Sequence, residues 1–131
     1  MAEGKIIGLA HIGIKVRDMA ASLKFYTEVL GFEKTGEQMF GTSHLAFLNA
    51  GTCILELIQG AQYEERTAGQ VDHVAVEVKG IEALVEKLKA QGVQFLSDEV
   101  KVAPGLLDGV KNIFFVGPDG ERFEFFEYYN R

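Results

Sequence analysis

The chain has 131 residues, a formal net charge of -6 and 47% hydrophobic residues, which fits one ordinary globular domain and excludes a disordered chain. Its acidic balance and scattered Lys and Arg residues exclude a nucleic-acid-binding or membrane-surface protein, and no apolar run approaches the roughly 18 residues of a membrane-spanning helix. The first residues do not resemble a signal peptide and the single cysteine, Cys53, cannot form an internal disulfide, so we expect a cytoplasmic protein.

The first predicted strand covers residues 9–16, where apolar and less apolar side chains alternate. His11 lies on the less apolar face of this strand, together with Gly13 and Lys15. The opposite face carries the apolar residues Ile12, Ile14 and Val16. One face of the strand can therefore enter a core while the histidine face remains available for chemistry.

Residues 19–30 carry apolar side chains at three- and four-residue spacing, which predicts a helix. Asp18 is a plausible N-cap, and Gly31 is placed to end the helix. The apolar stripe would pack on the Ile/Val face of the sheet. We therefore expect the His11 face to be free of helix and able to form a cavity.

A third strand is expected near residues 33–39, where the pattern is poorly defined. Residues 45–56 then read as a strand, a Gly-containing turn and a second strand, which predicts a hairpin. Glu56 lies inside the second of these strands, flanked by apolar residues on both sides. Burying a carboxylate there costs several kcal/mol unless a cation or strong donors compensate it.

The second half of the chain repeats the order of the first. Residues 71–78 alternate in the same way and place His73 where the first half has His11. A helical stripe follows from residue 81 to residue 88, and Gly92 is placed to end that helix. A weak strand is expected near residues 94–102.

The final hairpin completes the repeat. Residues 113–124 align with residues 45–56 without a gap, and this alignment places Glu124 where the first half has Glu56. Each half is thus predicted to be a βαβββ module, and the chain an α+β protein made by duplication. The period of about 60 residues is too long for a solenoid repeat.

Two histidines and two glutamates occupy equivalent positions in the two halves, namely His11, Glu56, His73 and Glu124. Any one of them alone would more simply be a surface residue or a satisfied core residue. The joint pattern instead favours ligands of one shared divalent cation. Imidazole nitrogen and carboxylate oxygen suit Zn, Ni, Co, Mn or Fe, and the sequence does not choose among these metals. Four protein ligands could leave water positions open, as a Lewis-acid catalyst requires.

The chain resembles the vicinal oxygen chelate superfamily, which includes glyoxalase I, methylmalonyl-CoA epimerase, extradiol dioxygenases, fosfomycin-resistance enzymes and bleomycin-binding proteins. The similarity covers about residues 6–129. The motifs that carry it are His11-Ile-Gly-Ile-Lys-Val-Arg-Asp18, Ser22-Leu-Lys-Phe-Tyr-Thr-Glu-Val-Leu-Gly-Phe32, Ile54-Leu-Glu-Leu57, Asp72-His-Val-Ala-Val76 and Gly117-Pro-Asp-Gly-Glu-Arg-Phe-Glu124.

The resemblance implies a single domain over residues 1–131, in which module one (about 6–59) and module two (about 71–129) form a half-open cup around the metal. It implies His11, Glu56, His73 and Glu124 as the ligands, a small-molecule substrate, and a homodimer. The modules that share one cup belong to one chain in some relatives and to two chains in others.

Within the superfamily, residues 117–124 look most like glyoxalase I, or lactoylglutathione lyase. This resemblance implies a metal-dependent isomerase that converts the hemithioacetal of a 2-oxoaldehyde such as methylglyoxal, with glutathione as co-substrate, to a 2-hydroxyacyl thioester through an enediolate. Glu124 is expected to be the proton-transferring base, with Glu56 as the second candidate. Lys15 and Lys101 are the expected substrate-binding residues.

Two positions depart from the glyoxalase I pattern. Lys15 stands where an Arg often binds the glutathione carboxylate, and lysine lacks the bidentate fork of arginine. Gly60 stands where an Asn often follows the first metal-binding Glu. Both departures concern glutathione and leave the predicted metal site unchanged.

Two other functions remain open. One is an epimerase like methylmalonyl-CoA epimerase, which would use the same metal. The other is a non-catalytic protein that sequesters a small molecule, as bleomycin-resistance proteins do, although such binders typically lack the ligand set. An extradiol dioxygenase is disfavoured because a site of two His and one carboxylate would leave one Glu surplus.

Several further residues receive structural interpretations. His44 has no counterpart in the second half, and Cys53 is interpreted as a packed small residue. Glu127 alternates to the face opposite Glu124. Arg17 and Arg122 could steady an anionic substrate but are more simply surface charges, whereas Lys111 could equally contact an anion or lie in a plain surface connection.

Overall fold

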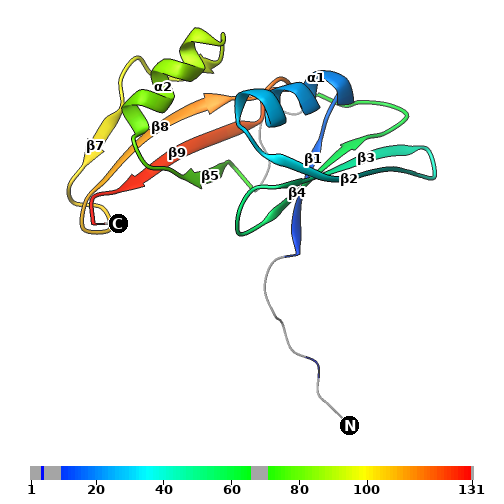
Figure 1. The fold of residues 1–131 in the computed structure, drawn as a ribbon, viewed down its shortest axis with the longest axis horizontal. Helices are drawn as coiled ribbons and strands as arrows, with labels where there is room; N and C mark the ends of the chain where they lie inside the picture. Colours follow the sequence, from blue (N-terminus) through cyan, green and yellow to red (C-terminus); the bar gives the residue numbers. More distant parts are fainter. Residues whose placement is uncertain (1–3, 5–9, 66–70, 131) are drawn as a thin grey trace. The chain divides into compact units, whose positions relative to one another are not determined.

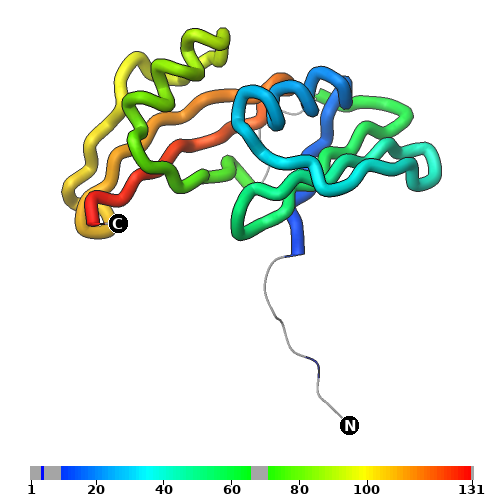
Figure 2. Tube along the Cα trace, viewed as in Figure 1, coloured from blue at the N-terminus to red at the C-terminus, as the bar shows by residue number. Residues whose placement is uncertain are grey.

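The computed structural model describes residues 4, 10–65 and 71–130. Residues 6–9, where the first module and its first strand were expected to begin, lie outside the described residues. The chain divides into two compact units, Met1–Glu64 and Glu65–Arg131. Both units contain a helix and a small β-sheet, as the ribbon and the Cα trace show (Figures 1 and 2).

Unit 1 contains a four-stranded sheet in the order β1-β4-β3-β2. The strands are β1 (His11–Lys15), β2 (Glu33–Phe40), β3 (Ser43–Asn49) and β4 (Ile54–Gln59). Strands β1 and β4 are parallel, whereas the β2–β3 and β3–β4 pairs are antiparallel. The poorly defined strand that was predicted near residues 33–39 is therefore a full edge strand, β2.

The helix of unit 1 begins as α1 (Met19–Lys24) and continues as a π-helical segment, η1 (Phe25–Val29). The carboxylate of Asp18 accepts hydrogen bonds from the backbone N–H groups of Ala20 and Ala21, at 3.0 and 3.4 Å, so the predicted N-cap is confirmed. Gly31 follows the helix with φ 79°, the left-handed conformation that ends helices.

Helix α1 contacts strands β3 and β4 and covers one face of the sheet. The buried side chains of this core are Val16, Met19, Tyr26, Ala46, Leu48, Leu55 and Leu57. Glu56 lies between two of these residues on β4 and therefore points to the opposite face. The predicted division into an apolar helix face and a histidine face is confirmed in this unit.

Unit 2 has a sheet in the order β5-β9-β8-β6, and β7 also pairs with β8. Its elements are β5 (Val74–Glu77), α2 (Ile81–Ala90), β6 (Gln94–Phe95), β7 (Lys101–Ala103), β8 (Val110–Val116) and β9 (Arg122–Tyr128). The single strand expected near residues 94–102 is thus two short strands. They are separated by a turn in which the Ser97 hydroxyl donates to the Glu99 carbonyl at 3.2 Å.

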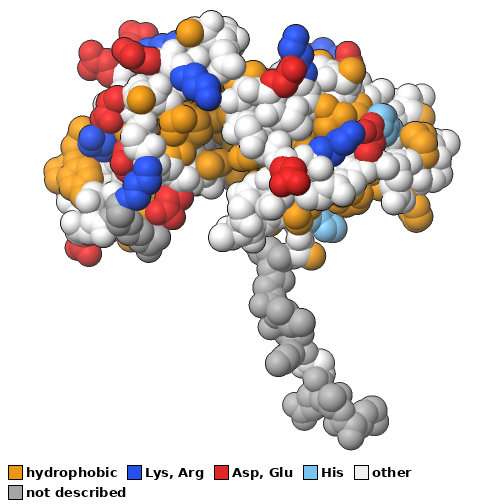
Figure 3. All heavy atoms as spheres, in the orientation of Figure 1, with side chains coloured by type: hydrophobic (Ala, Val, Ile, Leu, Met, Phe, Trp, Pro, Cys, Tyr) orange, Lys and Arg blue, Asp and Glu red, His pale blue; other side chains and the backbone are white. Residues whose placement is uncertain are grey.

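The core of unit 2 contains a cluster of phenylalanine rings. Phe115 stacks on Phe123 with ring centroids 5.6 Å apart and meets Phe125 at 4.7 Å. Helix α2 buries its apolar stripe of Ile81, Val85 and Leu88, while Figure 3 shows charged side chains on its outer surface. None of the helices in the described residues is long and apolar enough to span a membrane.

The two final hairpins differ by one residue, so the gapless alignment of residues 45–56 with 113–124 is wrong along the first strand of each hairpin. Asn49 pairs with Ile54 across the turn at 50–53, whereas Val116 pairs with Arg122 across the longer turn at 117–121. Phe47 lies opposite Glu56, and Phe114 lies opposite Glu124. The structural equivalent of Phe114 is therefore Phe47. The predicted equivalence of the two glutamates is unaffected.

Candidate metal centre

Unit 1 brings His11 and Glu56 together. Because β1 and β4 are parallel neighbours, with Gly13 directly opposite Glu56, the glutamate reaches across to the histidine at the start of β1. His11 Nε2 lies 3.3 Å from Glu56 Oε1. The His11 side chain is 47% exposed and that of Glu56 17%. A Cβ atom on Gly13 would make only ordinary contacts, at 3.4 Å from Ile58 Cδ1 and 3.9 Å from Glu56 Oε1.

Unit 2 repeats this arrangement with His73 and Glu124. Ala75 on β5 lies opposite Glu124 on β9, and His73 directly precedes β5. His73 Nε2 lies 3.3 Å from Glu124 Oε1, the same distance as in unit 1. The Glu124 side chain is only 8% exposed, so this carboxylate is considerably more buried than its counterpart.

Further side chains surround the pair in unit 2. The Asp72 carboxylate lies 2.9 Å from His73 Nδ1, on the other side of the imidazole from Glu124. The hydrogen bond to His73, together with the charge of Arg122 at 3.5 Å, lowers the pKa of Asp72. The Asn112 amide donates to Glu124 Oε2 at 2.7 Å. His73 therefore has Asp72 as its partner, and Glu124 has Asn112.

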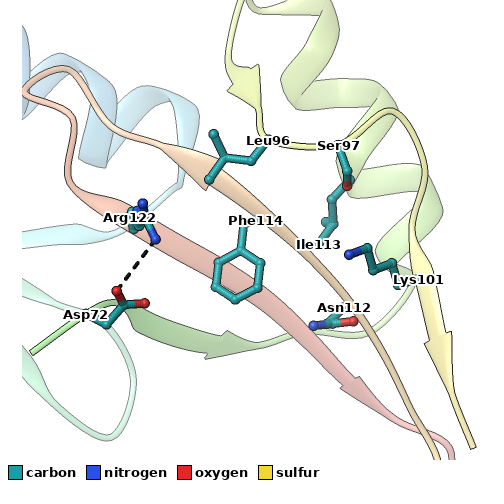
Figure 4. A pocket seen from close by; sticks show the side chains of 8 residues that line it. All are labelled: Asp72, Leu96, Ser97, Lys101, Asn112, Ile113, Phe114 and Arg122. Carbon is teal, nitrogen blue, oxygen red and sulfur yellow. Dashed lines mark ion pairs between the residues drawn. The ribbon is translucent and has the colours of Figure 1, made fainter. Parts of the chain in front are cut away.

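A pocket of about 190 Å³ lies beside these residues in unit 2. Figure 4 shows Phe114 between the Arg122–Asp72 ion pair on one side and the Lys101 side chain on the other. Leu96 and Ile113 add apolar walls, and Asn112 connects the pocket to Glu124. The volume is below the roughly 300 Å³ of typical small-molecule sites, so the pocket fits a part of a substrate. The two cationic side chains of the lining, Lys101 and Arg122, suit an anionic substituent.

The donor atoms of both pairs fit a divalent cation. Imidazole nitrogen and carboxylate oxygen bind metals such as zinc at about 2.0–2.2 Å, so two donors on one ion lie about 3.0–3.5 Å apart. The 3.3 Å separation in each unit falls within this range. Each unit by itself brings together two of the four predicted ligands. Among the described residues, no group of three or more His, Cys, Asp or Glu side chains is gathered closely enough to hold a metal.

The two predicted substrate-binding lysines differ in their surroundings. Lys101, on β7, lines the pocket of unit 2. Lys15 is exposed on the same face of β1 as His11. Of the other basic residues, Arg122 also lines the pocket, Lys111 pairs with Glu82 at 2.9 Å, and Arg17 lies over the Tyr63 ring.

Three further residues have structural partners. His44 Nε2 contacts Glu37 at 2.6 Å, and the hydrogen bond to Lys34, followed by that to His44, lowers the pKa of Glu37. Cys53 Sγ contacts the Ile54 carbonyl at 3.6 Å. Glu127 accepts hydrogen bonds from the first residues of α2 and lies on the face opposite Glu124, as the alternation predicted.

Sequence reasoning did not single out Asp72 or Asn112. The signal for Asp72 was its position next to His73, but an adjacent carboxylate contacts the ring only for one backbone geometry. Asn112 lies two residues before Phe114 and hence on the same face of β8. The strand pairing that places Phe114 opposite Glu124, and hence Asn112 on the face that carries Glu124, is not visible in the sequence.

Comparison with known proteins places the chain in a family. Its sequence matches the family model of the glyoxalase/bleomycin resistance protein/dioxygenase superfamily over residues 8–125. The chain belongs to this superfamily. The fold agrees, because a glyoxalase family protein from Enterococcus faecalis, at 26% identity, superimposes with a TM-score of 0.76 over 92% of this chain and 98% of that protein.

Individual members of the superfamily resemble the chain at moderate identity. The uncharacterized protein YwbC of Bacillus subtilis is 36% identical over 89% of this chain and 94% of its own length. A probable lactoylglutathione lyase of Vibrio parahaemolyticus is 31% identical over 95% and 91%, respectively. The mitochondrial methylmalonyl-CoA epimerase of Bos taurus is 30% identical over 72% of this chain, which spans 59% of the epimerase. The relatives thus include two different named activities.

Proposed function

We propose that the protein is a divalent-metal-dependent isomerase of the glyoxalase I type, which converts a 2-oxoaldehyde hemithioacetal to a 2-hydroxyacyl thioester. The observation that carries this proposal is the duplicated His–Glu pair, with its donor atoms 3.3 Å apart in both units. The similarity to a lactoylglutathione lyase over nearly the whole chain supports the reaction type.

In this proposal His11, Glu56, His73 and Glu124 all bind one cation, which is Zn, Ni, Co, Mn or Fe. The bound cation would supply Lewis-acid polarisation of the substrate carbonyl. Glu124 moves the proton between the two adjacent carbons, with Glu56 as the alternative base. Burial of Glu124, whose side chain is 8% exposed, supports this role because a base shielded from bulk water can move a proton between substrate atoms without losing it to solvent.

Lys101 is the proposed anchor for an anionic group of the substrate, which is a carboxylate when the thiol is glutathione. Its support is the pocket, where Lys101 and Arg122 flank the Phe114 ring. Lys15 would contact a second anionic group from the His11 face. We further propose that the two modules work as one domain, and that the protein is a cytoplasmic homodimer.

The second candidate is an epimerase of the methylmalonyl-CoA type, favoured by the 30% identity to the bovine enzyme. Both reactions remove a proton from a carbon next to a carbonyl group, so both would use the same metal ligands and a carboxylate base. They differ in the thiol and in the substituent that the pocket would hold.

The test is to remove metal from the protein and reload it separately with Ni, Co, Mn, Zn and Fe. Each form is assayed with the methylglyoxal–glutathione hemithioacetal and with methylmalonyl-CoA epimers. We expect metal-dependent turnover of the hemithioacetal that falls at least 100-fold in Glu124→Gln. The matched control is Glu86→Gln, on the exposed surface of α2, which should retain full turnover.

The outcomes separate the candidates. Turnover of the CoA ester alone would replace the isomerase with the epimerase. Metal binding without turnover of either substrate would contradict both reactions, and absence of metal binding would leave a non-catalytic sequestering protein. Loss of activity in Glu56→Gln but not in Glu124→Gln would exchange the roles of the two glutamates.

A further inference from the structure

A continuous chain of side-chain contacts passes through the His–Glu pair of unit 2. Arg122 lies 3.5 Å from Asp72 Oδ1, and Asp72 Oδ2 lies 2.9 Å from His73 Nδ1. His73 Nε2 lies 3.3 Å from Glu124 Oε1, and the Asn112 amide donates to Glu124 Oε2 at 2.7 Å. The imidazole is thus contacted on both nitrogens and the carboxylate on both oxygens.

We propose that Asp72 is a positioning residue that holds His73 as the Nδ1–H tautomer and so commits the His73–Glu124 pair to binding a cation. The inference rests on the proposed function for its role in catalysis. The contact itself does not depend on the reaction. A carboxylate on the far nitrogen of a metal-binding histidine is a common means of fixing its tautomer and ring orientation.

The tautomer determines what the other nitrogen can do. An ionised carboxylate only accepts hydrogen bonds, so a neutral His73 that contacts Asp72 through Nδ1 must carry its proton there. Nε2 then presents a lone pair to Glu124 Oε1, which also carries lone pairs. Two such atoms 3.3 Å apart repel each other unless a cation lies between them. Asp72 therefore makes the pair bind positive charge.

Asn112 fixes the orientation of Glu124, as Asp72 fixes that of His73. Its amide occupies Glu124 Oε2, which leaves Oε1 as the oxygen directed at His73. Phe114 meets the His73 ring edge-on, with centroids 5.1 Å apart, and restricts its rotation. Three neighbours thus hold the two donors of unit 2 in one geometry.

Among its described residues, unit 1 offers no counterpart of the Asp72 or Asn112 contact. Ala10 stands at the position of Asp72, and Leu45 is the structural equivalent of Asn112 in the observed strand register. His11 can therefore carry its proton on Nε2 and direct it at Glu56 Oε1, an arrangement in which the two facing atoms attract each other without a metal. The duplicated chain thus contains its own control for the effect of Asp72.

The experiment measures tautomers by nitrogen-15 NMR of histidine-labelled, metal-free full-length protein at about pH 8.5, where an ordinary imidazole is neutral. We expect His73 to be the Nδ1–H tautomer in the natural sequence and to shift toward the Nε2–H tautomer in Asp72→Ala. Asp72→Asn should retain the Nδ1–H tautomer, because its amide oxygen still accepts. The His11 resonances should be the same in all three proteins.

Metal affinity gives the second measurement. Competition with a chelator for Zn²⁺ should show about a 10- to 100-fold weaker affinity for Asp72→Ala than for the natural sequence, and a smaller loss for Asp72→Asn. An unchanged His73 tautomer in Asp72→Ala would overturn the inference. Failure to turn over the hemithioacetal would contradict the proposed function but leave the tautomer result standing.

Discussion

The two units hold the same His–Glu pair in different surroundings. Both pairs span a parallel strand pair, and both have their donor atoms 3.3 Å apart. The pair in unit 1 is the more exposed, whereas Asp72, Asn112 and Phe114 surround the pair in unit 2. The comparison teaches that the sheet geometry sets the donor distance. The neighbouring side chains then decide how firmly the donors are held.

The same contrast recurs where the last strand of each unit meets its helix. Gln59 Oε1 accepts a hydrogen bond from the backbone N–H of Met19, the first residue of α1, at 2.6 Å. Glu127 occupies the equivalent position in unit 2 and accepts from Gly80 and Ile81 at 3.2 and 3.0 Å. The contact is the same, but only the side chain in unit 2 can be ionised.

The largest expected effect concerns the two cores. Phe115 is fully buried against the rings of Phe95, Phe123 and Phe125, so Phe115→Ala should lower the free energy of unfolding by about 3–5 kcal/mol. Its structural equivalent in unit 1 is Leu48, also fully buried, where Leu48→Ala should cost about 2–5 kcal/mol. Urea unfolding of the full chain measures both values.

The control for Phe115 is its neighbour Phe114, which points to the opposite face of β8 and lines the pocket. Phe114→Ala should cost clearly less stability than Phe115→Ala while releasing the His73 ring. Equal losses in the two variants would contradict the division of the sheet into a core face and a site face.

The second prediction concerns the 117–121 turn, whose extra residue distinguishes the second hairpin from the first. A Cβ atom on Gly117 would lie 2.5 Å from Glu121 Cδ, so Gly117→Ala must displace the Glu121 side chain. That side chain accepts a hydrogen bond from the backbone N–H of Asp119 at 2.8 Å. We expect Gly117→Ala to cost about 1–2 kcal/mol, measured by thermal unfolding. In the Glu121→Ala background, where the clash is absent, the same substitution should cost much less.

The sequence predicted much of this architecture because alternation along a strand decides which side chains share a face. Alternation therefore located the helix and histidine faces, and the capping preferences of Asp and Gly located Asp18 and Gly31 at the ends of the first helix. It missed the extra residue in the 117–121 turn, since an alignment by residue type cannot detect a shift that hydrogen bonds between strands define. The roles of Asp72 and Asn112 were not predicted for a related reason, because their contacts with Arg122 and Glu124 depend on how neighbouring strands pair. The shared four-ligand centre, Lys15 and Lys101 stay predictions.

The smallest expected effect depends on pH and concerns Glu127. Its hydrogen bonds from the backbone N–H groups of Ile81 and Gly80 lower the pKa of this carboxyl. A lowered pKa in the folded state means that the ionised cap stabilises the protein above the usual glutamate pKa. This contribution is then lost as the pH falls through the lowered value. Glu127→Gln should therefore cost about 1 kcal/mol at pH 7 and progressively less toward acidic pH.

The reciprocal variant makes this a comparison of the two units. Gln59→Glu places an ionisable group beside Met19 at the start of α1 and should make the stability of unit 1 depend on pH in the same direction. Urea unfolding at a series of pH values between about 3 and 7 checks both variants. If Glu127→Gln leaves the pH dependence of unfolding unchanged, the charge of Glu127 contributes nothing at this helix terminus. The two caps would then be energetically equivalent despite their different chemistry.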